Sequence, residues 1–504
     1  MDMYLYNELY GTMARDVPGL LERLTDLPQL PELPSLYEYA VQHSLYIEAQ
    51  GGTTGRWAGW PRGIPTEKTV LGWLDSVVTE LSAEMARVHK GRRRVSAYST
   101  SAGLPLTDGD CLRKSDIVLS SMRSYDTGED LYDPSMFSIS EQRISWKTVR
   151  LPGELKQSTK YSNYDSTIAQ LANYVREIFG AQQTRMWVHG FTLCAEDFRA
   201  WIFDRDGGLG TKLISIHKEP LLFIKAIIGF ACMDASELGF DPTIRWKPEG
   251  EADSIVYDAT VYHSLPDAAL PFIEAEIKGS MKCLEINVKT PLARRIALHS
   301  RGTAVFAARI CSPSSTTASQ SPKPVHWDLA VKEQWRAPIM AIEETILRSL
   351  SPEQAAIGLP LFHFHQDMGR VSTLVRQGID LSGVMIEPPS SGSPRSEAIV
   401  DDDNGSTRRS GPNSELDQSA SKKRIKLAMG KVGASGGRMV GGTDDNKDQM
   451  DLVGEASLLT AGIWRFNDRT KSRLVISPIG KPLHHFKTYT ELLMGIRDAV
   501  KGIF

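Results

Sequence analysis

The 504-residue sequence has few cysteines and no long apolar run. The cysteines are Cys111, Cys194, Cys232, Cys283 and Cys311. They are odd in number, lie far apart and form no Cys-x-x-Cys pair, which argues against both a disulfide framework and a zinc site and fits a reducing compartment. The most apolar stretch, residues 221–233, is interrupted by Lys225 and is too short to cross a bilayer.

A strong charge imbalance is also absent, because the net charge is −3. This balance implies no global attraction to nucleic acid or membranes, so we expect neither as a partner. The first residues lack the basic and then apolar layout of a signal peptide. With 41% hydrophobic and 24% charged residues, the composition is that of a globular protein. We therefore expect an intracellular protein, either nuclear or cytoplasmic.

Periodicity along the chain predicts an α+β protein with a helical N-terminus. Residues 66–87 have apolar side chains at helical spacing, and residues 166–179 and 220–233 also read as helices. Strand-like runs surround the helices predicted at 166–179 and 220–233. The Asp-Gly-Gly at residues 206–208 suggests a tight hairpin. The expected regions are a helical region (1–105), a mixed α/β domain (106–245), a connection and further sheet (246–387), a disordered insertion (388–450) and a last ordered part (451–504).

The α/β domain contains a spaced set of polar residues that is typical of metal-dependent nucleases. Asp116 precedes one strand, and Glu154 and Lys156 form a Glu-x-Lys triplet on the next. Gln170 and Tyr174 are four residues apart and so share a face of the following helix. Two carboxylates can hold a divalent cation while a lysine steadies the phosphate, as in nucleases of the PD-(D/E)XK class. We favour a degenerate domain of this kind, used for regulation or scaffolding, over active cleavage. Alternatively, Glu154 and Lys156 form a surface pair across the strand, and Gln170 and Tyr174 only pack.

A lysine and two glutamates suggest a second kind of site. Lys332 lies in a strand of alternating character, and Glu343 and Glu344 lie in the helix predicted after it, within residues 338–350. Protein kinases use one strand lysine to hold ATP phosphates and one helix glutamate to hold that lysine. Taken alone, such a pair is more often a pair of surface charges.

Longer stretches of the chain resemble the fungal-type protein kinase family. The stretches are TRMWVHGFTLCAEDFRAWIFDRDGG, IIGFACMDASELGFDPTI, SRGTAVFAAR, VKEQW and RLVISPIGKPLHHFKTYTELLMGIRDAVK. They occur in the family's order and cover most of the chain from about residue 100 onward. The resemblance implies a kinase-like N-lobe, interrupted by the disordered insertion, and ATP with Mg²⁺ as the family's cofactors.

The resemblance also implies roles for individual residues. Lys332 would bind the ATP phosphates, with Glu344, or failing that Glu343, as its ion-pair partner. Residues 300–303, with Arg301 and Gly302, would form the turn over the phosphates. The hinge beside adenine would be residues 476–480, including Ile476 and Ile479.

The given sequence has no His-Arg-Asp and no Asp-Phe-Gly string, so the resemblance assigns no catalytic residue for phosphotransfer. We expect a kinase fragment or pseudokinase whose ATP binding is doubtful. A lone N-lobe would expose the face that normally meets the second lobe, so an unknown protein partner would cover it.

The histidines and the basic residues of the insertion form two further patterns. The eleven histidines form no His-x-x-x-His pair, so no metal site is predicted from them. Two basic clusters in the insertion resemble a bipartite nuclear localisation signal, although a solubilising charge cluster is an equal alternative. The residues are Arg408, Arg409, Lys422, Lys423, Arg424 and Lys426.

Overall fold

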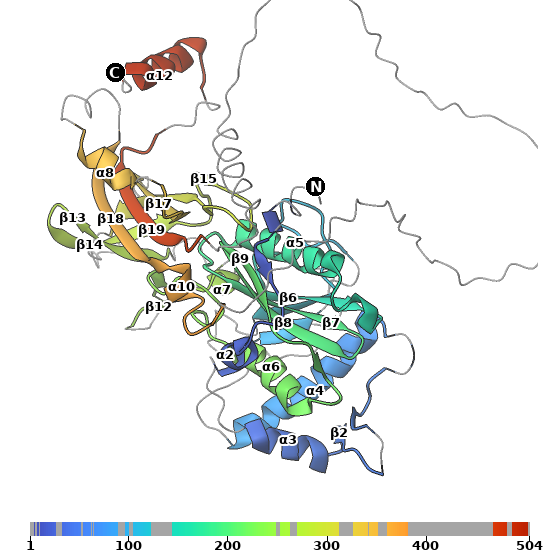
Figure 1. The fold of residues 1–504 in the computed structure, drawn as a ribbon. Helices are drawn as coiled ribbons and strands as arrows, with labels where there is room; N and C mark the ends of the chain where they lie inside the picture. Colours follow the sequence, from blue (N-terminus) through green and yellow to red (C-terminus); the bar gives the residue numbers. More distant parts are fainter. Residues whose placement is uncertain are drawn as a thin grey trace, which may run out of the picture. The chain divides into compact units, whose positions relative to one another are not determined.

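The structure is a computed structural model that describes a defined part of the chain (Figure 1). The described residues are 5, 8–9, 11–26, 33–51, 54–61, 63, 65–88, 96–99, 104–121, 144–247, 253–262, 270–311, 326–340, 342–350, 360–381, 467–480 and 486–501. The predicted insertion at 388–450 and its nuclear localisation residues lie outside these ranges. In the described parts, no helix is long and apolar enough to span a membrane.

A mixed sheet forms the first part of the fold, in the order β1-β9-β8-β7-β6-β5-β4, with β10 paired to β8. Its strands are β1 (Met13–Ala14), β4 (Ser96–Ser99), β5 (Ile117–Ser121), β6 (Val149–Lys156), β7 (Val188–Cys194), β8 (Asp197–Asp204), β9 (Gly207–Gly210) and β10 (Ile214–Ser215). Strand β5 is antiparallel to both of its neighbours, β4 and β6, whereas β6 and β7 are parallel. The helix α5 (Asp165–Ala181) provides the crossover that this parallel pair requires.

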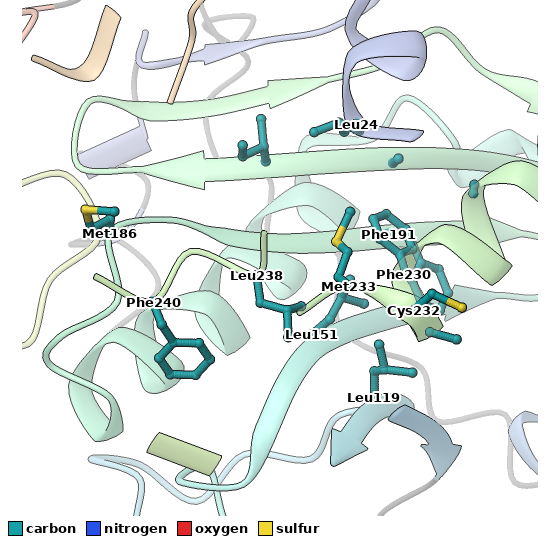
Figure 2. Close-up of a cluster of buried hydrophobic side chains, with 14 of the residues drawn as sticks. Leu24, Leu119, Leu151, Met186, Phe191, Phe230, Cys232, Met233, Leu238 and Phe240 are labelled. Carbon is teal, nitrogen blue, oxygen red and sulfur yellow. The ribbon is translucent and has the colours of Figure 1, made fainter. Parts of the chain in front are cut away.

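Helices cover both faces of the first sheet (Figure 1). Side chains alternate along β8, so that Ala200 and Ile202 join one buried cluster and Trp201 and Phe203 join another. The second cluster packs under α5. The first packs against α4 (Glu67–Val88) and α6 (Pro220–Cys232), and Figure 2 shows part of it. Burial on both faces explains why these strands are apolar over most of their length.

This part of the fold also contains several short elements. They are α2 (Leu20–Asp26), α3 (Leu33–Gln42), the hairpin strands β2 (Tyr46–Ile47) and β3 (Arg56–Trp57), and the 3₁₀ turn η2 (Thr159–Tyr161). Trp57 lies in the buried aromatic cluster with Trp73 and Phe223, so β3 packs onto α4 and α6.

A second, antiparallel sheet follows, in the order β12-β11-β13-β14-β16-β17-β19-β18, with β15 paired to β16. Its strands are β11 (Arg245–Trp246), β12 (Ile255–Val256), β13 (Phe272–Ile277), β14 (Ser280–Asn287), β15 (Ala293–Arg294), β16 (Ala304–Ile310), β17 (Leu329–Arg336), β18 (Leu361–Arg370) and β19 (Thr470–Ser477). The helices are α7 (Ala259–Tyr262), α8 (Glu343–Arg348), α10 (Val371–Leu374) and α12 (Tyr489–Lys501). Residues 382–466, which the structure leaves undescribed, connect β18 and α10 to β19.

The mixed α/β character predicted from the sequence is confirmed, and so are its long helices. The helices predicted at 66–87, 166–179 and 220–233 correspond to α4, α5 and α6. The predicted hairpin is the β8–β9 pair, in which Asp204 lies opposite Gly207. The helix expected over 338–350 is shorter, because α8 contains only Glu343–Arg348 and none of its residues is buried.

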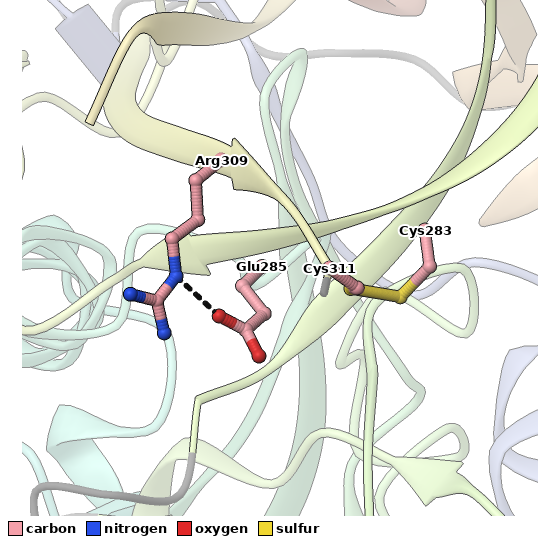
Figure 3. Close-up of a disulfide and its surroundings, with 4 residues drawn as sticks. All are labelled: Cys283, Glu285, Arg309 and Cys311. Carbon is pink, nitrogen blue, oxygen red and sulfur yellow. Dashed lines mark hydrogen bonds and ion pairs between the residues drawn. A yellow bond between two sulfur atoms is a disulfide. The ribbon is translucent and has the colours of Figure 1, made fainter. Parts of the chain in front are cut away.

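The expectation that the cysteines form no disulfide was wrong for one pair (Figure 3). Cys283 on β14 is bonded to Cys311, 28 residues away. The strands β14 and β16 pair antiparallel, with Leu284 opposite Ile310, so the next positions are neighbours. The backbone N–H of Cys311 donates to the carbonyl oxygen of Cys283 at 2.8 Å. This proximity arises from strand register, which spacing in the sequence does not reveal.

Candidate functional site

The acidic residues predicted in the α/β domain meet at one end of β5 and β6. Ile117 lies opposite Gly153, so the next step of the antiparallel ladder places Asp116 beside Glu154. An oxygen of the Asp116 carboxylate accepts the backbone N–H of Leu155 at 2.8 Å. Glu154 is 1% exposed. The two carboxylates are therefore held together by main-chain pairing.

Lys156 faces the same side of β6 as Glu154, since the two are separated by one residue of a strand. Its Nζ lies 2.5 Å from Oε1 of Glu154. The other oxygen, Oε2, is buried and accepts no hydrogen bond from the described residues. One oxygen of the carboxylate is thus paired with Lys156, and Tyr174 and Asp116 also act on the carboxylate.

The helix α5 places Tyr174 at this site, where its hydroxyl interacts with Glu154. Gln170, one turn earlier, is exposed. Within the described residues no hydrogen bond joins Gln170 to Asp116, Glu154 or Lys156. The structure therefore brings four of the five predicted residues together and leaves Gln170 at the rim.

Glu67 is a further acidic residue at this site, and the sequence interpretation missed it. It begins α4, and its carboxyl interacts with Asp116 and with Lys156. One feature of the sequence could have identified Glu67: it is a carboxylate in the first turn of α4, the helix that precedes strands β4 to β6. Its approach to Asp116, 49 positions later in the chain, depends on packing of α4 against the sheet.

Burial and mutual repulsion alter the ionisation of these groups. Burial, followed by the charge of Glu154, raises the pKa of Asp116 to about 7. Burial also raises the pKa of Glu154, against the opposing effect of Lys156. The pKa of Glu67 is raised by burial and then by Asp116, and that of Tyr174 by burial and then by Glu154. Near neutral pH the site therefore favours an added proton or cation.

A cavity of about 340 Å³ adjoins these residues. It is lined by Trp60, Pro65, Thr66, Glu67, Lys68, Val70, Leu155, Lys156, Gln157, Leu193 and Ala195. Its wall combines an aromatic ring, two lysines and the acidic end of α4. In the described part of the chain, no three His, Cys, Asp or Glu residues are arranged to hold a metal ion.

The second sheet carries the lysine and glutamate pair. Lys332 lies in the middle of β17, opposite Val305 of β16 and Leu474 of β19. Its Nζ is 2.5 Å from Oε2 of Glu343, the first residue of α8. The two side chains are 22% and 37% exposed, so the pair faces solvent in part.

Of the two glutamates that the resemblance allowed as partner, the structure pairs Glu343 with Lys332. Glu344, the first choice, points elsewhere: its carboxylate is 2.7 Å from Nε of Arg348 and 2.7 Å from Nδ1 of His365. Adjacent helix residues point about 100° apart, so only one of them can face β17.

The turn expected over the phosphates joins β15 to β16 and is packed against the first sheet. The backbone N–H of Gly302 donates to Oγ of Ser300 at 3.0 Å. Gly302 has φ +51°, and a Cβ there would lie 2.6 Å from Nε of Arg205. Glycine is thus required by both conformation and space. Arg301 continues the pairing with β17, because its carbonyl oxygen accepts the N–H of Trp335.

The expected hinge follows directly from β19. Ile476 is half-buried and lies opposite Ala330 of β17, while Ile479 follows the end of the strand. Both residues lie at the C-terminal end of β19, in the same sheet as Lys332. This placement is compatible with a hinge. Adenine binding by them stays a prediction.

Comparison with known proteins gives one match. A family model described as fungal protein kinase matches residues 134–504, which is more than half of the chain. No curated protein and no solved structure matches this chain.

Proposed function

Because the chain belongs to the fungal protein kinase family, we propose that its second sheet forms the part of a kinase that holds a nucleotide, with Lys332 on the phosphates. The observation that carries this proposal is the contact between Lys332 and Glu343. A strand lysine held by a glutamate of the following helix is the arrangement that kinases use for this purpose.

The strand order supports the same proposal. The run β14-β16-β17-β19-β18 is antiparallel, with α8 inserted between β17 and β18. The strand that carries Lys332 is in the centre, with β16 and the proposed phosphate-covering turn on one side and the proposed hinge strand β19 on the other. This order supports a kinase N-lobe.

In the proposed site, Lys332 offers a positive charge to the α- and β-phosphates, and Glu343 fixes its position. Mg²⁺ supplies neutralisation of phosphate charge in kinases. We assign it no ligand among the described residues and assign no phosphotransfer step to this chain.

Nucleotide titration tests the proposal. The full chain should bind ATP, and Lys332→Ala should weaken binding by about tenfold or more, because a charge-assisted contact with the phosphates is lost. Lys282→Ala is the matched control, because Lys282 is an exposed lysine on β14 of the same sheet and its change removes the same charge. Equal ATP affinity in the wild type and the Lys332 variant would refute the proposal.

A second candidate function is favoured by the acidic site of the first sheet. We propose it as a metal-dependent phosphodiester hydrolase of the PD-(D/E)XK type, or a scaffold descended from one. Three antiparallel strands, a crossover helix and a parallel fourth strand form the core of that fold, and β4 to β7 with α5 follow this order.

Two carboxylates of this site are candidate ligands for a divalent cation, with no group of three His, Cys, Asp or Glu residues arranged to hold one in the described part of the chain. The adjoining carboxylates and the raised pKa of Asp116 favour added positive charge, from a proton or a cation. Asp116 and Glu154 would hold the ion, which would supply Lewis acidity at a phosphate. Lys156 would orient the anionic substrate, and Tyr174 would help to position Glu154.

Incubation with single- and double-stranded DNA in Mg²⁺ or Mn²⁺ tests this candidate. Cleavage should be lost in Glu154→Gln, which preserves side-chain volume, and retained in Glu80→Gln, an exposed position on α4. If the wild type cuts neither substrate with either metal, the scaffold alternative is favoured.

A further inference from the structure

The segment 296–302, which leads into the turn at 300–303 assigned above to nucleotide phosphates, packs against the first sheet. Leu298 is fully buried and belongs to the cluster under α5, with Ile178 and Phe179. On the same helix, the carbonyl oxygen of Gly180 accepts a hydrogen bond from Arg294 at 2.7 Å. The turn is therefore fixed at its tip and at its base.

Backbone amides of this turn point at a carboxylate. The N–H of Leu298 donates to Oε2 of Glu8 at 3.0 Å. The N–H of His299 also hydrogen-bonds the Glu8 side chain. Two successive main-chain N–H groups directed at one anion form the kind of concave site that binds phosphate in nucleotide-binding proteins.

Three arginine side chains act electrostatically on the same carboxylate. The charges of Arg176 and Arg295 act on Glu8. Arg205 also interacts with it, while its Nη1 donates to the carbonyl oxygen of Ala297 at 2.6 Å. The guanidinium of Arg205 is buried and lies 3.9 Å from the ring centre of Phe179. The Glu8 carboxylate thus accepts main-chain N–H groups of the turn, and the charges of Arg176, Arg205 and Arg295 act on it.

We propose that residues 296–302 form an anion-binding turn and that Glu8 occupies the place of a nucleotide phosphate group in it. The proposal rests on the nucleotide function proposed above and adds its regulation. The segment that carries Glu8 competes with the nucleotide, and phosphate binds the turn only after that carboxylate has left.

The chemistry of the two anions supports this exchange. A carboxylate and a phosphate both accept N–H hydrogen bonds and both pair with guanidinium groups. The occupied turn cannot offer the N–H groups of Leu298 and His299 to a second anion. When a binding-competent state is only partly populated, the apparent affinity falls in proportion to its population. Removing the Glu8 charge should therefore raise affinity without any new contact.

Titration of the full chain with ATP tests the proposal. Glu8→Ala and Glu8→Gln should each tighten ATP binding by about tenfold or more, because a hydrogen-bonded charge no longer competes. Glu8→Gln preserves side-chain volume and guards against a folding defect, which thermal unfolding of each variant would report. Glu38→Gln, at an exposed position on α3, removes the same charge and should leave affinity unchanged.

The outcomes separate this proposal from the one on which it rests. ATP binding that depends on Lys332 but is identical in the wild type and both Glu8 variants would overturn the role of Glu8 and keep the nucleotide site. If no variant binds ATP, the nucleotide function fails, and pyrophosphate becomes the probe. Pyrophosphate binding by Glu8→Ala and not by the wild type would keep the anion-binding turn, whereas binding by neither would overturn it.

Discussion

Arg376 donates two hydrogen bonds to the carboxylate of Asp204, from Nε at 2.7 Å and from Nη2 at 2.8 Å. Asp204 ends β8 in the first sheet, and Arg376 follows α10 near β18 of the second sheet. On the same turn, Asp206 accepts the backbone N–H of Arg469 at 3.0 Å. The β8–β9 turn thus holds both chain segments that flank the undescribed residues 382–466.

Replacing Asp204 with alanine should strongly destabilise the protein. The side chains of Asp204 and Arg376 are 1% and 4% exposed. Removing one partner of a buried pair leaves an uncompensated charge, which typically costs about 3–5 kcal/mol. We expect a loss of that size in the free energy of unfolding, measured by urea denaturation of the full chain.

The matched control is Glu285→Ala. Glu285 pairs with Arg309 across β14 and β16, as Figure 3 shows, and the two side chains are 29% and 31% exposed. Partly exposed pairs contribute roughly 0.2–1 kcal/mol, so this variant should lose no more than that. Equal losses in the two variants would show that Asp204 and Arg376 do not form a buried bridge.

His189 should make the stability depend on pH. Burial is the main cause that lowers its pKa from an ordinary value of 6.5 to about 4. The ring is neutral in the folded protein, and Nε2 lies 2.9 Å from the carbonyl oxygen of Glu237. Because the unfolded chain takes up a proton first, the stabilisation is complete above pH 6.5 and is lost as pH falls toward 4.

The measurement is the unfolding free energy between pH 7.5 and pH 4.5 for the wild type and His189→Gln. A single such group contributes a slope of at most about 1.4 kcal/mol per pH unit. His299 is buried as well, with a pKa lowered to about 3, so the variant should lose only part of the slope. A slope identical to that of the wild type would show that His189 is accessible to protons in the folded state.

The disulfide predicts a response to reductants. A cross-link between residues 28 apart restricts the unfolded chain, and such links typically stabilise proteins by about 2–4 kcal/mol. Dithiothreitol should lower the Tm of the wild type, while Cys283→Ser should have a lower Tm that dithiothreitol does not change. Cys232→Ala, which changes a buried cysteine outside the disulfide, should keep the wild-type response. An unchanged wild-type Tm on reduction would exclude the cross-link in solution.

Local patterns made part of this fold predictable. The periodicity of α4, α5 and α6 arises from apolar faces that pack on the first sheet, and it is visible within one segment. The Glu-x-Lys triplet of Glu154 and Lys156 also lies within one strand. Both kinds of feature depend on neighbours in the sequence, which is why they could be identified without a structure.

The contacts that escaped prediction join distant segments. Glu8 meets Leu298, 290 positions later in the chain. Cys283 and Cys311 meet through strand register, and Glu67 reaches Asp116 through helix packing. Periodicity also could not choose between Glu343 and Glu344, because α8 buries none of its residues. Each of these contacts is set by tertiary structure and leaves no local signal.

The choice between the two glutamates gives a direct test of the nucleotide site. Glu343→Gln should weaken ATP binding by roughly two- to fivefold, because partly exposed ion pairs contribute about 0.5–1 kcal/mol to the position of Lys332. Glu344→Gln removes the same charge from the next residue, whose partners are Arg348 and His365, and should leave ATP affinity unchanged.

A double-mutant cycle completes this test. Since Glu343 acts only through Lys332, Glu343→Gln should have no further effect once Lys332 is replaced by methionine, with residual binding measured at high ATP. Additive effects would mean that Glu343 contributes to the site independently of the lysine. Weakening by Glu344→Gln instead would indicate that α8 rotates when the nucleotide binds, so that the pair present in the free protein differs from the pair in the complex.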